Sequence, residues 1–487
     1  MQIPITDLSN KGSSSLAQKI ALVQGEKNWT YKELHEKACD IAGHLWADGL
    51  RPKDRLLLCL ENSFDLIASL LACFKIGVIV VHTYTDFSEA EYVYMSKNTG
   101  IKAVITSHFL YEKMKQIKHP HLVYFSFNGK PKDPAPSFEP DLDQPISISY
   151  TSGTTAKRKG VIQTYRTITE TMEGAVHSLG HQALARALII ASLGNNYAVM
   201  VYLLPALWLD GTLIFPPNNQ IETILKTIEK ENPTLAATYP YFLKQIIHHP
   251  QALKTHFTSL ELFLVGGDLV TPELYKEFLS VTKMPLTQGF GMTEAQLLFL
   301  DLSKDPKKQG SIGKPVVGVE AKIIDSQGYT LPNGKLGQIA VRRKTPFPGY
   351  WDFPEETAKA LHNGWLYTGD LGVEDADGYY WFRGRIKNVI IVEAENVSPI
   401  EVEEALYQHP AVKEVGVIGI PDEEKGNVVK AFVATKEKVT EEELKEFLKP
   451  LLAEYKIPTQ ILFIDHLPRT ITGKLDRNQL NKLCCHK

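Results

Sequence analysis

The sequence predicts an α/β protein with a large N-terminal domain of mostly parallel sheets flanked by helices plus a small antiparallel barrel, and a smaller α+β C-terminal domain. Short apolar runs alternate with helical patterns up to residue 266, which is typical of parallel sheets covered by helices. Glycine-rich turns then separate short alternating strands between residues 310 and 341, which indicates antiparallel sheet. After Gly384, helices and strands fit a compact unit of about 100 residues.

The N-terminal part shows the clearest alternation. Apolar residues recur at helix spacing from Leu34 to Leu45, and residues 65–76 and 88–99 are predicted as further helices. Gly77 suits the end of the first of these two helices. Strands are predicted at residues 55–60, 78–81, 102–106 and 146–150, with a loop at 130–143.

The later elements follow the same reasoning. A long helix is predicted after Val161, and Thr440 with Glu443 predicts a capping box. Further strands are predicted at residues 187–192, 213–215, 235–238, 262–266, 321–324, 337–341, 379–383, 412–420 and 428–435. Further helices are predicted at residues 221–231 and 397–408.

The composition is that of an ordinary globular protein, with 44% apolar and 22% charged residues. The net charge of −3 gives no electrostatic case for a nucleic acid partner or an anionic membrane. Apolar residues 66–81 and 197–209, the latter interrupted by Pro205, are too short for a membrane span and are predicted as buried core.

The five cysteines lack metal-ligand spacing and a disulfide framework, which predicts reduced thiols in a cytoplasmic enzyme. They are Cys39, Cys59, Cys73, Cys484 and Cys485. The first eleven residues lack the layout of a signal peptide, which agrees with a cytoplasmic location.

A hydroxyl-rich loop at residues 150–161 is the most informative stretch. It follows a predicted strand, and its backbone N–H and hydroxyl groups suit phosphate oxygens while its cations supply charge. The lysine ending of a Walker A loop and the glycine pattern of a dinucleotide site are absent. The hydroxyls surround Gly153 and the cations follow them: Thr151, Ser152, Thr154 and Thr155, then Lys157, Arg158 and Lys159.

Four more motifs follow in order, at residues 289–294 (GFGMTE), 367–370 (YTGD), 384–387 (GRIK) and 468–474 (PRTITGK). With the loop, they make the chain resemble the AMP-forming adenylating enzymes, the superfamily of acyl-CoA synthetases, peptide-synthetase adenylation domains and firefly luciferase. The five motifs span more than 300 residues, so the resemblance covers nearly the whole chain.

The resemblance implies a two-step reaction that uses ATP, Mg²⁺ and coenzyme A. A small-molecule carboxylic acid attacks the α-phosphate of ATP, which gives acyl-adenylate and pyrophosphate. A thiol, usually of coenzyme A, then attacks the acyl-adenylate and releases AMP. The resemblance also implies an adenylation domain at residues 1–386 and a mobile C-terminal domain at residues 387–487.

The resemblance further implies the phosphate contacts. The loop residues Thr151, Ser152, Gly153, Thr154 and Thr155 would grip the β- and γ-phosphates. Lys159 matches the lysine of the family's loop, and Thr293 would bond the phosphate or the carboxylate. Glu294 would hold Mg²⁺.

The adenosine contacts are implied in the same way. Phe290 matches the aromatic residue that stacks on adenine, and Gly267 with Asp268 resembles the backbone along the adenine edge. Asp370 matches the carboxylate that takes both ribose hydroxyls, a task that suits a bidentate acceptor. Arg385 matches a second ribose or phosphate contact.

Four residues near the C-terminal domain complete the implied site. Lys474 matches the lysine that bridges the carboxylate and the α-phosphate in the transition state. Lys387 stands at the family's hinge, where the small domain is expected to rotate between the two steps. Glu393 and Ala394 match the loop that lines the thiol tunnel.

Three residues depart from the family's pattern. Ala156 and Ala394 stand where glycine is usual, so the phosphate loop and the thiol tunnel are expected to differ in shape. Arg158 replaces a proline and is expected to add charge near the pyrophosphate.

Residues 191–200 bear on which carboxylic acid is the substrate. They contain no acidic residue that could pair with a buried ammonium group, which argues against an α-amino acid substrate. Asn195, Asn196 and Tyr197 are candidates for the acyl pocket. The two asparagines are equally consistent with pocket donors and with helix caps. Candidates for an apolar wall are Met200, Leu203 and Leu297.

Two other functions are consistent with the sequence. One is an adenylating enzyme that loads an acyl-carrier protein instead of coenzyme A. The other is a degenerate relative that binds nucleotide or acyl-adenylate without full turnover, which Ala156, Arg158 and Ala394 would explain. A luciferase-like oxygenase is remote.

Overall fold

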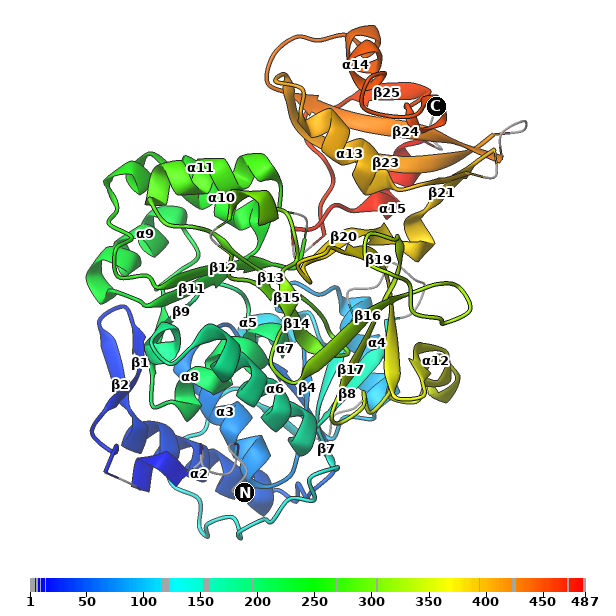
Figure 1. Cartoon of the computed structure of the whole chain (residues 1–487). Coiled ribbons are helices and arrows are strands. Elements are labelled where there is room, and N and C mark those ends of the chain that lie inside the picture. Colours follow the sequence, from blue (N-terminus) through cyan, green and yellow to red (C-terminus); the bar gives the residue numbers. More distant parts are fainter. Residues whose placement is uncertain are drawn as a thin grey trace.

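The computed structural model describes the chain apart from residues 1–4, 6, 7, 9, 14, 116, 118–121, 152–157, 195, 269, 304, 394, 423–425, 471, 472 and 485–487. The described residues form a large body and a smaller unit above it (Figure 1). The body carries the N-terminal part of the chain, and the smaller unit carries the C-terminal part. This arrangement agrees with the α/β fold class that the sequence predicts.

The larger sheet of the body contains nine strands within the described residues, in the order β15-β14-β13-β12-β11-β9-β10-β1-β2. Neighbours from β1 through β10, β9, β11 and β12 to β13 are parallel, and antiparallel strands flank both ends. The bounds are β1 (Ile20–Gln24), β2 (Lys27–Thr30), β9 (Arg186–Ile189), β10 (Thr212–Phe215), β11 (Leu235–Thr238), β12 (Leu262–Gly266), β13 (Thr287–Met292), β14 (Gln296–Asp301) and β15 (Lys314–Pro315).

The second sheet has six strands in the part of the chain that the structure describes, in the order β6-β5-β3-β4-β7-β8. It is parallel except for the β7–β8 hairpin, which brackets the hydroxyl-rich loop. Its strands are β3 (Arg55–Cys59), β4 (Ile79–His82), β5 (Ala103–Thr106), β6 (Leu122–Tyr124), β7 (Pro145–Tyr150) and β8 (Gly160–Thr164).

Helices fill the space between the two sheets and cover their outer faces. The main core joins α2, α3, α6 and the run from α7 to α8 to both sheets. Helices α9, α10 and α11 cover the outer face of the larger sheet, and α4 with α5 covers that of the second. The bounds are α2 (Tyr31–Ala47), α3 (Phe64–Lys75), α4 (Glu89–Thr99), α5 (His108–Glu112), α6 (Tyr165–Leu179), α7 (Asn196–Ala198), α8 (Leu204–Trp208), α9 (Ile221–Glu231), α10 (Pro240–His248) and α11 (Pro272–Thr282).

The antiparallel part of the body is a five-stranded sheet among the described residues, in the order β16-β17-β19-β18 with β20 beside β19. It provides the barrel-like antiparallel unit that the glycine-rich turns predict. Its elements are β16 (Val319–Ile324), β17 (Gly337–Arg343), β18 (Leu361–His362), β19 (Trp365–Glu374), β20 (Tyr380–Arg385) and helix α12 (Pro354–Ala360).

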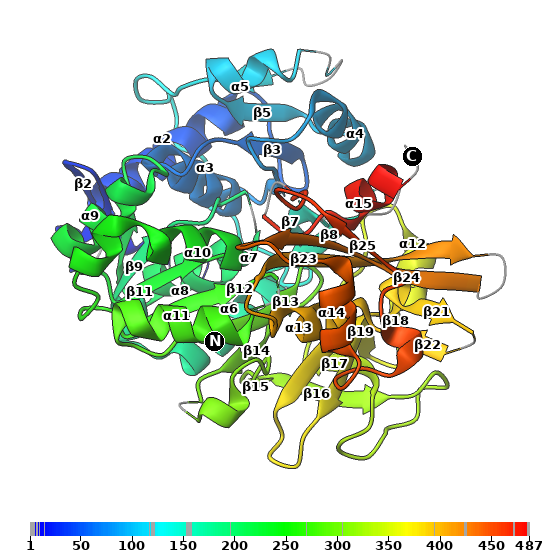
Figure 2. The ribbon, with the colours of Figure 1, turned by 90° about the horizontal axis from the view of Figure 1, so that it is seen from above.

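The C-terminal unit packs α13 and α14 on a sheet in which β24 lies between β23 and β25. The predicted capping box of Thr440 and Glu443 is present at the start of α14. From above, β23 and β24 lie over β7, β8 and β13 (Figure 2). The elements are β21 (Ile390–Val392), β22 (Glu395–Val397), α13 (Pro399–Tyr407), β23 (Val412–Asp422), β24 (Gly426–Thr435), α14 (Glu441–Leu448), β25 (Gln460–Phe463) and α15 (Arg477–Cys484).

The helical segment after β9 differs from the sequence prediction. The strand predicted to reach residue 192 ends at Ile189, and Pro205 does not interrupt the helix. A π-helical turn, η3 (Val199–Leu203), precedes this proline, and the N–H of Leu204 donates to the carbonyl of Val199. Because proline lacks an N–H and crowds the preceding turn, the wider turn accommodates it without a break. No described helix is long and apolar enough to cross a membrane.

Two left-handed glycines give a matched test of packing at the end of a helix. Gly49 (φ +88°) has no atom within 4 Å of an added Cβ, whereas a Cβ at Gly77 (φ +69°) would lie 2.5 Å from the ring of Phe138. We expect Gly49→Ala to cost about 1 kcal/mol from backbone strain alone. Gly77→Ala should cost more because the Phe138 ring must also move.

Urea unfolding of the full chain, followed by circular dichroism, measures this difference. The midpoints should fall in the order wild type, Gly49→Ala, Gly77→Ala. Equal midpoints for the two variants would show that Phe138 does not pack against Gly77.

Candidate functional site

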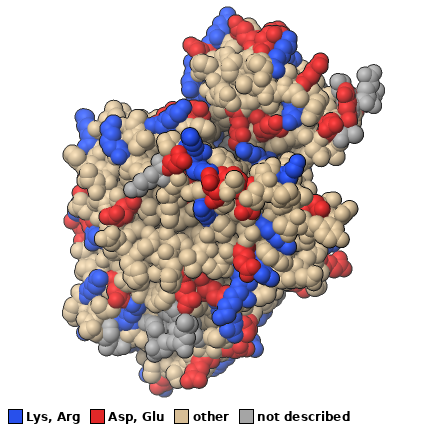
Figure 3. Space-filling model, in the orientation of Figure 1, with Lys and Arg blue, Asp and Glu red and all other residues tan. Residues whose placement is uncertain are grey.

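One large cavity lies at the seam between the body and the C-terminal unit. Its volume is about 1270 Å³, and both parts of the chain contribute to its walls. Pockets for single small molecules occupy roughly 300–1,000 Å³, so there is room for a nucleotide and a second ligand. Acidic and basic side chains gather around this hollow (Figure 3).

The cavity brings together most of the residues singled out from the sequence. Those that line it are Thr151, Lys159, Asn196, Tyr197, Gly267, Asp268, Phe290, Thr293, Glu294, Asp370, Arg385, Lys387 and Lys474. Glu393 is exposed and does not line it. The following residues lie outside the described residues: Ser152, Gly153, Thr154, Thr155, Ala156, Lys157, Asn195 and Ala394.

Asp370 is a buried carboxylate on β19, held opposite Arg385 of β20 by the register of the two strands. The Arg385 Nε lies 2.8 Å from Asp370 Oδ1, yet neither carboxylate oxygen accepts a well-aligned hydrogen bond from the described residues. Burial raises the pKa of Asp370 to about 6, with a further increase from Glu294, while Arg385 and Lys474 oppose the shift. A buried carboxylate with this much capacity to accept further hydrogen bonds fits a ligand with two adjacent hydroxyls, as ribose has.

Aromatic side chains form a wall close to this carboxylate. The ring of Phe290 on β13 lies 5.5 Å from that of Phe382 and 6.0 Å from that of Phe299. Phe290 is held between the two glycines at positions 289 and 291, where an added Cβ would meet neighbouring atoms within 3 Å. Phe290 and Phe382 line the cavity, and an exposed aromatic ring there suits a planar base.

Glu294 and Lys159 both contact Tyr350. The Tyr350 hydroxyl donates to Glu294 Oε1 at 2.7 Å, and the Lys159 ammonium lies 4.2 Å from the centre of the Tyr350 ring. Lys159 also lies 3.4 Å from Glu356. The described residues contain no group of three or more metal-ligating side chains. Mg²⁺ is commonly held by one or two carboxylates together with substrate phosphates, and Glu294 is a carboxylate of the cavity wall that suits such a site.

The pairing of β7 with β8 holds the two ends of the hydroxyl-rich loop together. The N–H of Thr151 donates to the carbonyl of Lys159 at 3.0 Å. Arg158 was predicted to add charge near the pyrophosphate, and in the structure its charge is paired with a carboxylate outside the cavity. Its guanidinium lies 2.5 Å from Glu91, donates to the Thr151 carbonyl and rests over the ring of Phe87, and the side chain does not line the cavity. A carboxylate on α4 therefore draws this arginine away.

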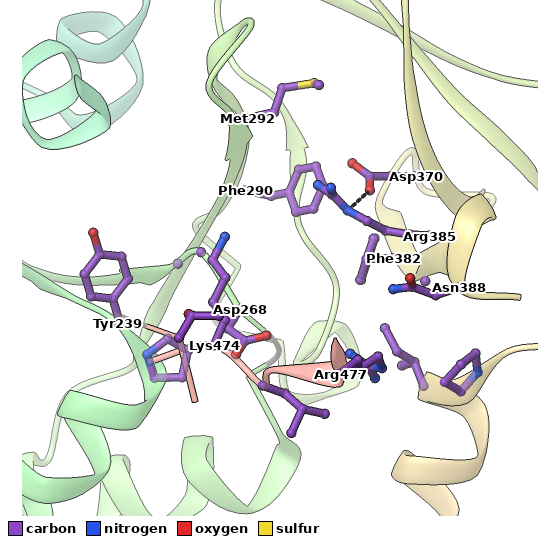
Figure 4. A pocket seen from close by; sticks show the side chains of 18 of the residues that line it. Tyr239, Asp268, Phe290, Met292, Asp370, Phe382, Arg385, Asn388, Lys474 and Arg477 are labelled. Atoms are coloured by element: carbon purple, nitrogen blue, oxygen red, sulfur yellow. Dashed lines mark ion pairs between the residues drawn. The ribbon is translucent and has the colours of Figure 1, made fainter. Parts of the chain in front are cut away.

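Lys474 enters the cavity from the C-terminal unit. Burial lowers the pKa of its ammonium, whereas the carboxylates of Asp268 and Asp370 counteract that effect. An added Cβ at Gly267 would be in ordinary contact with Lys474 Cε at 3.9 Å but only 3.1 Å from the ring of Tyr239, so Gly267 brings the lysine stem close to this tyrosine. Lys474 and Asp268 lie between Tyr239 and the Asp370–Arg385 pair (Figure 4).

A tyrosine chamber forms the other end of the cavity. We use this name for the space lined by Tyr84, Asn196, Tyr197, Tyr202 and Tyr239. The side chain of Asn196 makes no hydrogen bond to the described residues, so it does not act as a helix cap. The apolar wall predicted from the sequence is wrong, because its three residues are buried in the protein core and do not line the cavity. They are Met200, Leu203 and Leu297.

Several cavity residues were not predicted from the sequence, although two of them carried a signal. Tyr239 directly follows β11 and Tyr84 lies two residues after β4, and ligands bind at the carboxyl ends of strands in open α/β sheets. Tyr350, Phe382 and Glu356 had no such signal, since they face the cavity only through the folding of the antiparallel sheet.

Comparisons with known proteins agree with this geometry. The AMP-binding enzyme family matches residues 12–351, and the AMP-binding enzyme C-terminal domain matches residues 401–474. A feruloyl-CoA synthase of Amycolatopsis sp is 31% identical, with 95% of both chains covered. A long-chain-fatty-acid–CoA ligase of Bacillus subtilis (strain 168) is 29% identical, covering 93% of this chain and 90% of the relative. A 2-succinylbenzoate–CoA ligase of Bacillus cereus (strain Q1) is 29% identical, with 94% of both covered.

Solved structures share the whole arrangement. ATP-bound MatB from Rhodopseudomonas palustris is 25% identical and has a TM-score of 0.92, covering 99% of this chain and 98% of that chain. The apo form of MatB, with the same identity and coverage, gives a TM-score of 0.81. The anthranilate CoA ligase AuaEII in complex with anthranoyl-AMP is 27% identical and gives 0.90, covering 98% of this chain and 96% of that chain.

The raised pKa of Asp370 predicts a pH dependence of ribose binding. Above about pH 6 the carboxylate is ionised and accepts from both hydroxyls, and below that pH it becomes protonated. We expect the affinity for adenosine, measured by calorimetry, to fall about fivefold between pH 7 and pH 5. Adenosine is the suitable probe because it carries no titrating phosphate.

Asp370→Asn is the matched control. Its affinity should be weaker at every pH and should not change between pH 5 and pH 7. A wild type with a flat profile would show that Asp370 does not bind the ribose.

Proposed function

The chain belongs to the AMP-binding enzyme family, and from this premise we propose how its cavity performs the two steps of an AMP-forming acyl-CoA ligase. In the first step a carboxylate attacks the α-phosphate of ATP, which gives acyl-adenylate and pyrophosphate. In the second step the thiol of coenzyme A attacks the acyl carbon and releases AMP.

The position of Lys474 carries this proposal. Its ammonium lies between the tyrosine chamber and the Asp370–Arg385 pair, which is where a carboxylate in the chamber would meet the α-phosphate of a nucleotide. Two anionic reactants repel each other, and a preorganised cation in a buried site stabilises the charge that develops between them. Lys474 would therefore stabilise the transition state of adenylation.

The nucleotide end follows from the remaining contacts. Phe290 and Phe382 would stack with adenine beside Gly267 and Asp268, while Asp370 and Arg385 would hold the ribose. Thr151, Thr293 and Lys159 would bind phosphate oxygens, together with residues 152–155 of the loop. Magnesium, when bound beside Glu294, would neutralise phosphate charge.

The second step calls for a different orientation of the C-terminal domain. We place the domain boundary between residues 386 and 387, with Lys387 as the hinge, in the short helical turn Ile386–Asn388. Glu393 is exposed and lies outside the cavity in this arrangement, so the loop of Glu393 and Ala394 would reach the thiol path only after rotation. The higher TM-score to ATP-bound MatB than to apo MatB supports an adenylation-type orientation here.

We also propose a cytoplasmic location. Cys39, Cys59, Cys73 and Cys484 are free thiols in the structure, which suits a reducing compartment.

Lys474→Ala tests the assignment of the first step. We expect ATP–pyrophosphate exchange to fall by about 100-fold or more, because a transition-state charge contact is lost. Thioester formation from supplied acyl-adenylate should be largely retained. Lys482→Ala, which removes an exposed lysine of α15, is the control and should match the wild type in both assays. Exchange near the wild-type rate in Lys474→Ala would refute the role of this lysine.

Lys387→Pro tests the hinge. Proline fixes φ, so adenylation should survive while transfer to coenzyme A fails. Lys387→Ala keeps the backbone freedom and should retain both half-reactions. If the proline variant loses both half-reactions equally, or transfers normally, the hinge lies elsewhere.

A further inference from the structure

The tyrosine chamber contains a buried amide that the protein leaves unsatisfied. Asn196 is 2% exposed, lines the cavity, and neither its Nδ2 nor its Oδ1 has a hydrogen-bond partner in the described residues. Unsatisfied buried polar groups destabilise a protein unless a ligand or water meets them. The side-chain amide of Asn196 is therefore placed for a ligand that hydrogen-bonds inside the chamber.

The chamber is polar but uncharged. Burial is the largest cause that raises the pKa of Tyr197, Tyr202 and Tyr84. The five residues that define the chamber are tyrosines and an asparagine, so none of these side chains carries a charge at neutral pH. The phenols thus remain protonated donors at neutral pH. A second carboxylate buried here would lose its hydration without gaining a cation.

A plain alkyl chain also fits the chamber poorly, because it has no polar group. It would cover the amide of Asn196 without satisfying it. The walls are aromatic rings, and those of Tyr197 and Tyr202 meet edge to face with centroids 6.3 Å apart. Aromatic rings in such a wall can stack on, or meet edge to face, the ring of an aromatic ligand, which a flexible alkyl chain does not offer.

We propose that the acid is an aromatic acid with an uncharged hydroxyl group remote from its carboxyl group, and that Asn196 binds this hydroxyl. A hydroxyl both donates and accepts, so it matches the free carbonyl oxygen and the free NH₂ of the asparagine side chain. The carboxyl group faces Lys474 at the opposite end of the chamber. The inference rests on the ligase activity proposed above and specifies its substrate class.

The test is a panel of acids assayed by AMP release with ATP and coenzyme A. The panel contains benzoic and cinnamic acids, their hydroxylated isomers, the corresponding dicarboxylic acids, and octanoic acid. We expect the best hydroxylated acid to exceed its parent acid in kcat/KM by about tenfold or more. Dicarboxylic acids and octanoic acid should be poorer than the hydroxylated acids.

Asn196→Leu is the decisive variant, since leucine keeps a similar volume and a good helix propensity but has no polar group. The preference for the hydroxylated acid over its parent should fall to within about twofold, and the thermal midpoint should not fall, because an unsatisfied group is removed. Ser69→Ala is the control. Ser69 is a buried and unpartnered hydroxyl outside the cavity, so its removal should leave the preference unchanged.

The outcomes separate the two proposals. AMP release with a preference for unsubstituted, alkyl or dicarboxylic acids would overturn the inference and leave the ligase activity standing. A hydroxyl preference that persists in Asn196→Leu would overturn the role of Asn196. The absence of AMP release with every acid would overturn the ligase activity, and the substrate class with it.

Discussion

One buried cation, the ammonium of Lys474, lies at the seam between the two units, and the cavity around it accommodates its charge. Removing the ammonium of Lys474 from water is costly, as its lowered pKa shows, and the carboxylates of Asp268 and Asp370 offset part of that cost. Because the cation belongs to the smaller unit, the cavity has to lie at the seam between the two units.

Local sequence patterns predicted the elements well and the cavity in part. Periodic apolar residues marked helices such as α2 and α9, and Thr440 with Glu443 marked the start of α14, because these signals depend on neighbours a few residues apart. The position of Arg158 was not predictable, since it is set by Glu91 on a distant helix. The same reason explains why Tyr350 was missed, as its partner Glu294 lies 56 positions away.

The cavity is divided by charge. Lysines, an arginine and carboxylates line the nucleotide end, whereas phenols and an amide line the chamber beyond Lys474. The tyrosine chamber also draws on other segments of the chain than the charged end, since Tyr84 follows β4, Asn196 and Tyr197 lie in α7, and Tyr239 follows β11.

The π-helical turn at Val199–Leu203 holds one residue more per turn than its flanks. Because of this turn, Asn196 and Tyr197 are rotated about the helix axis relative to α8 by a different angle than a regular helix would give. Helix α8 itself is packed in the core. Loss of one residue there would restore ordinary helical winding and rotate the chamber-facing side chains by roughly 100° relative to α8. A change of one residue in chain length at this turn would therefore change which side chains line the tyrosine chamber while the rest of the fold stays the same. Substrate choice could change in evolution by this route.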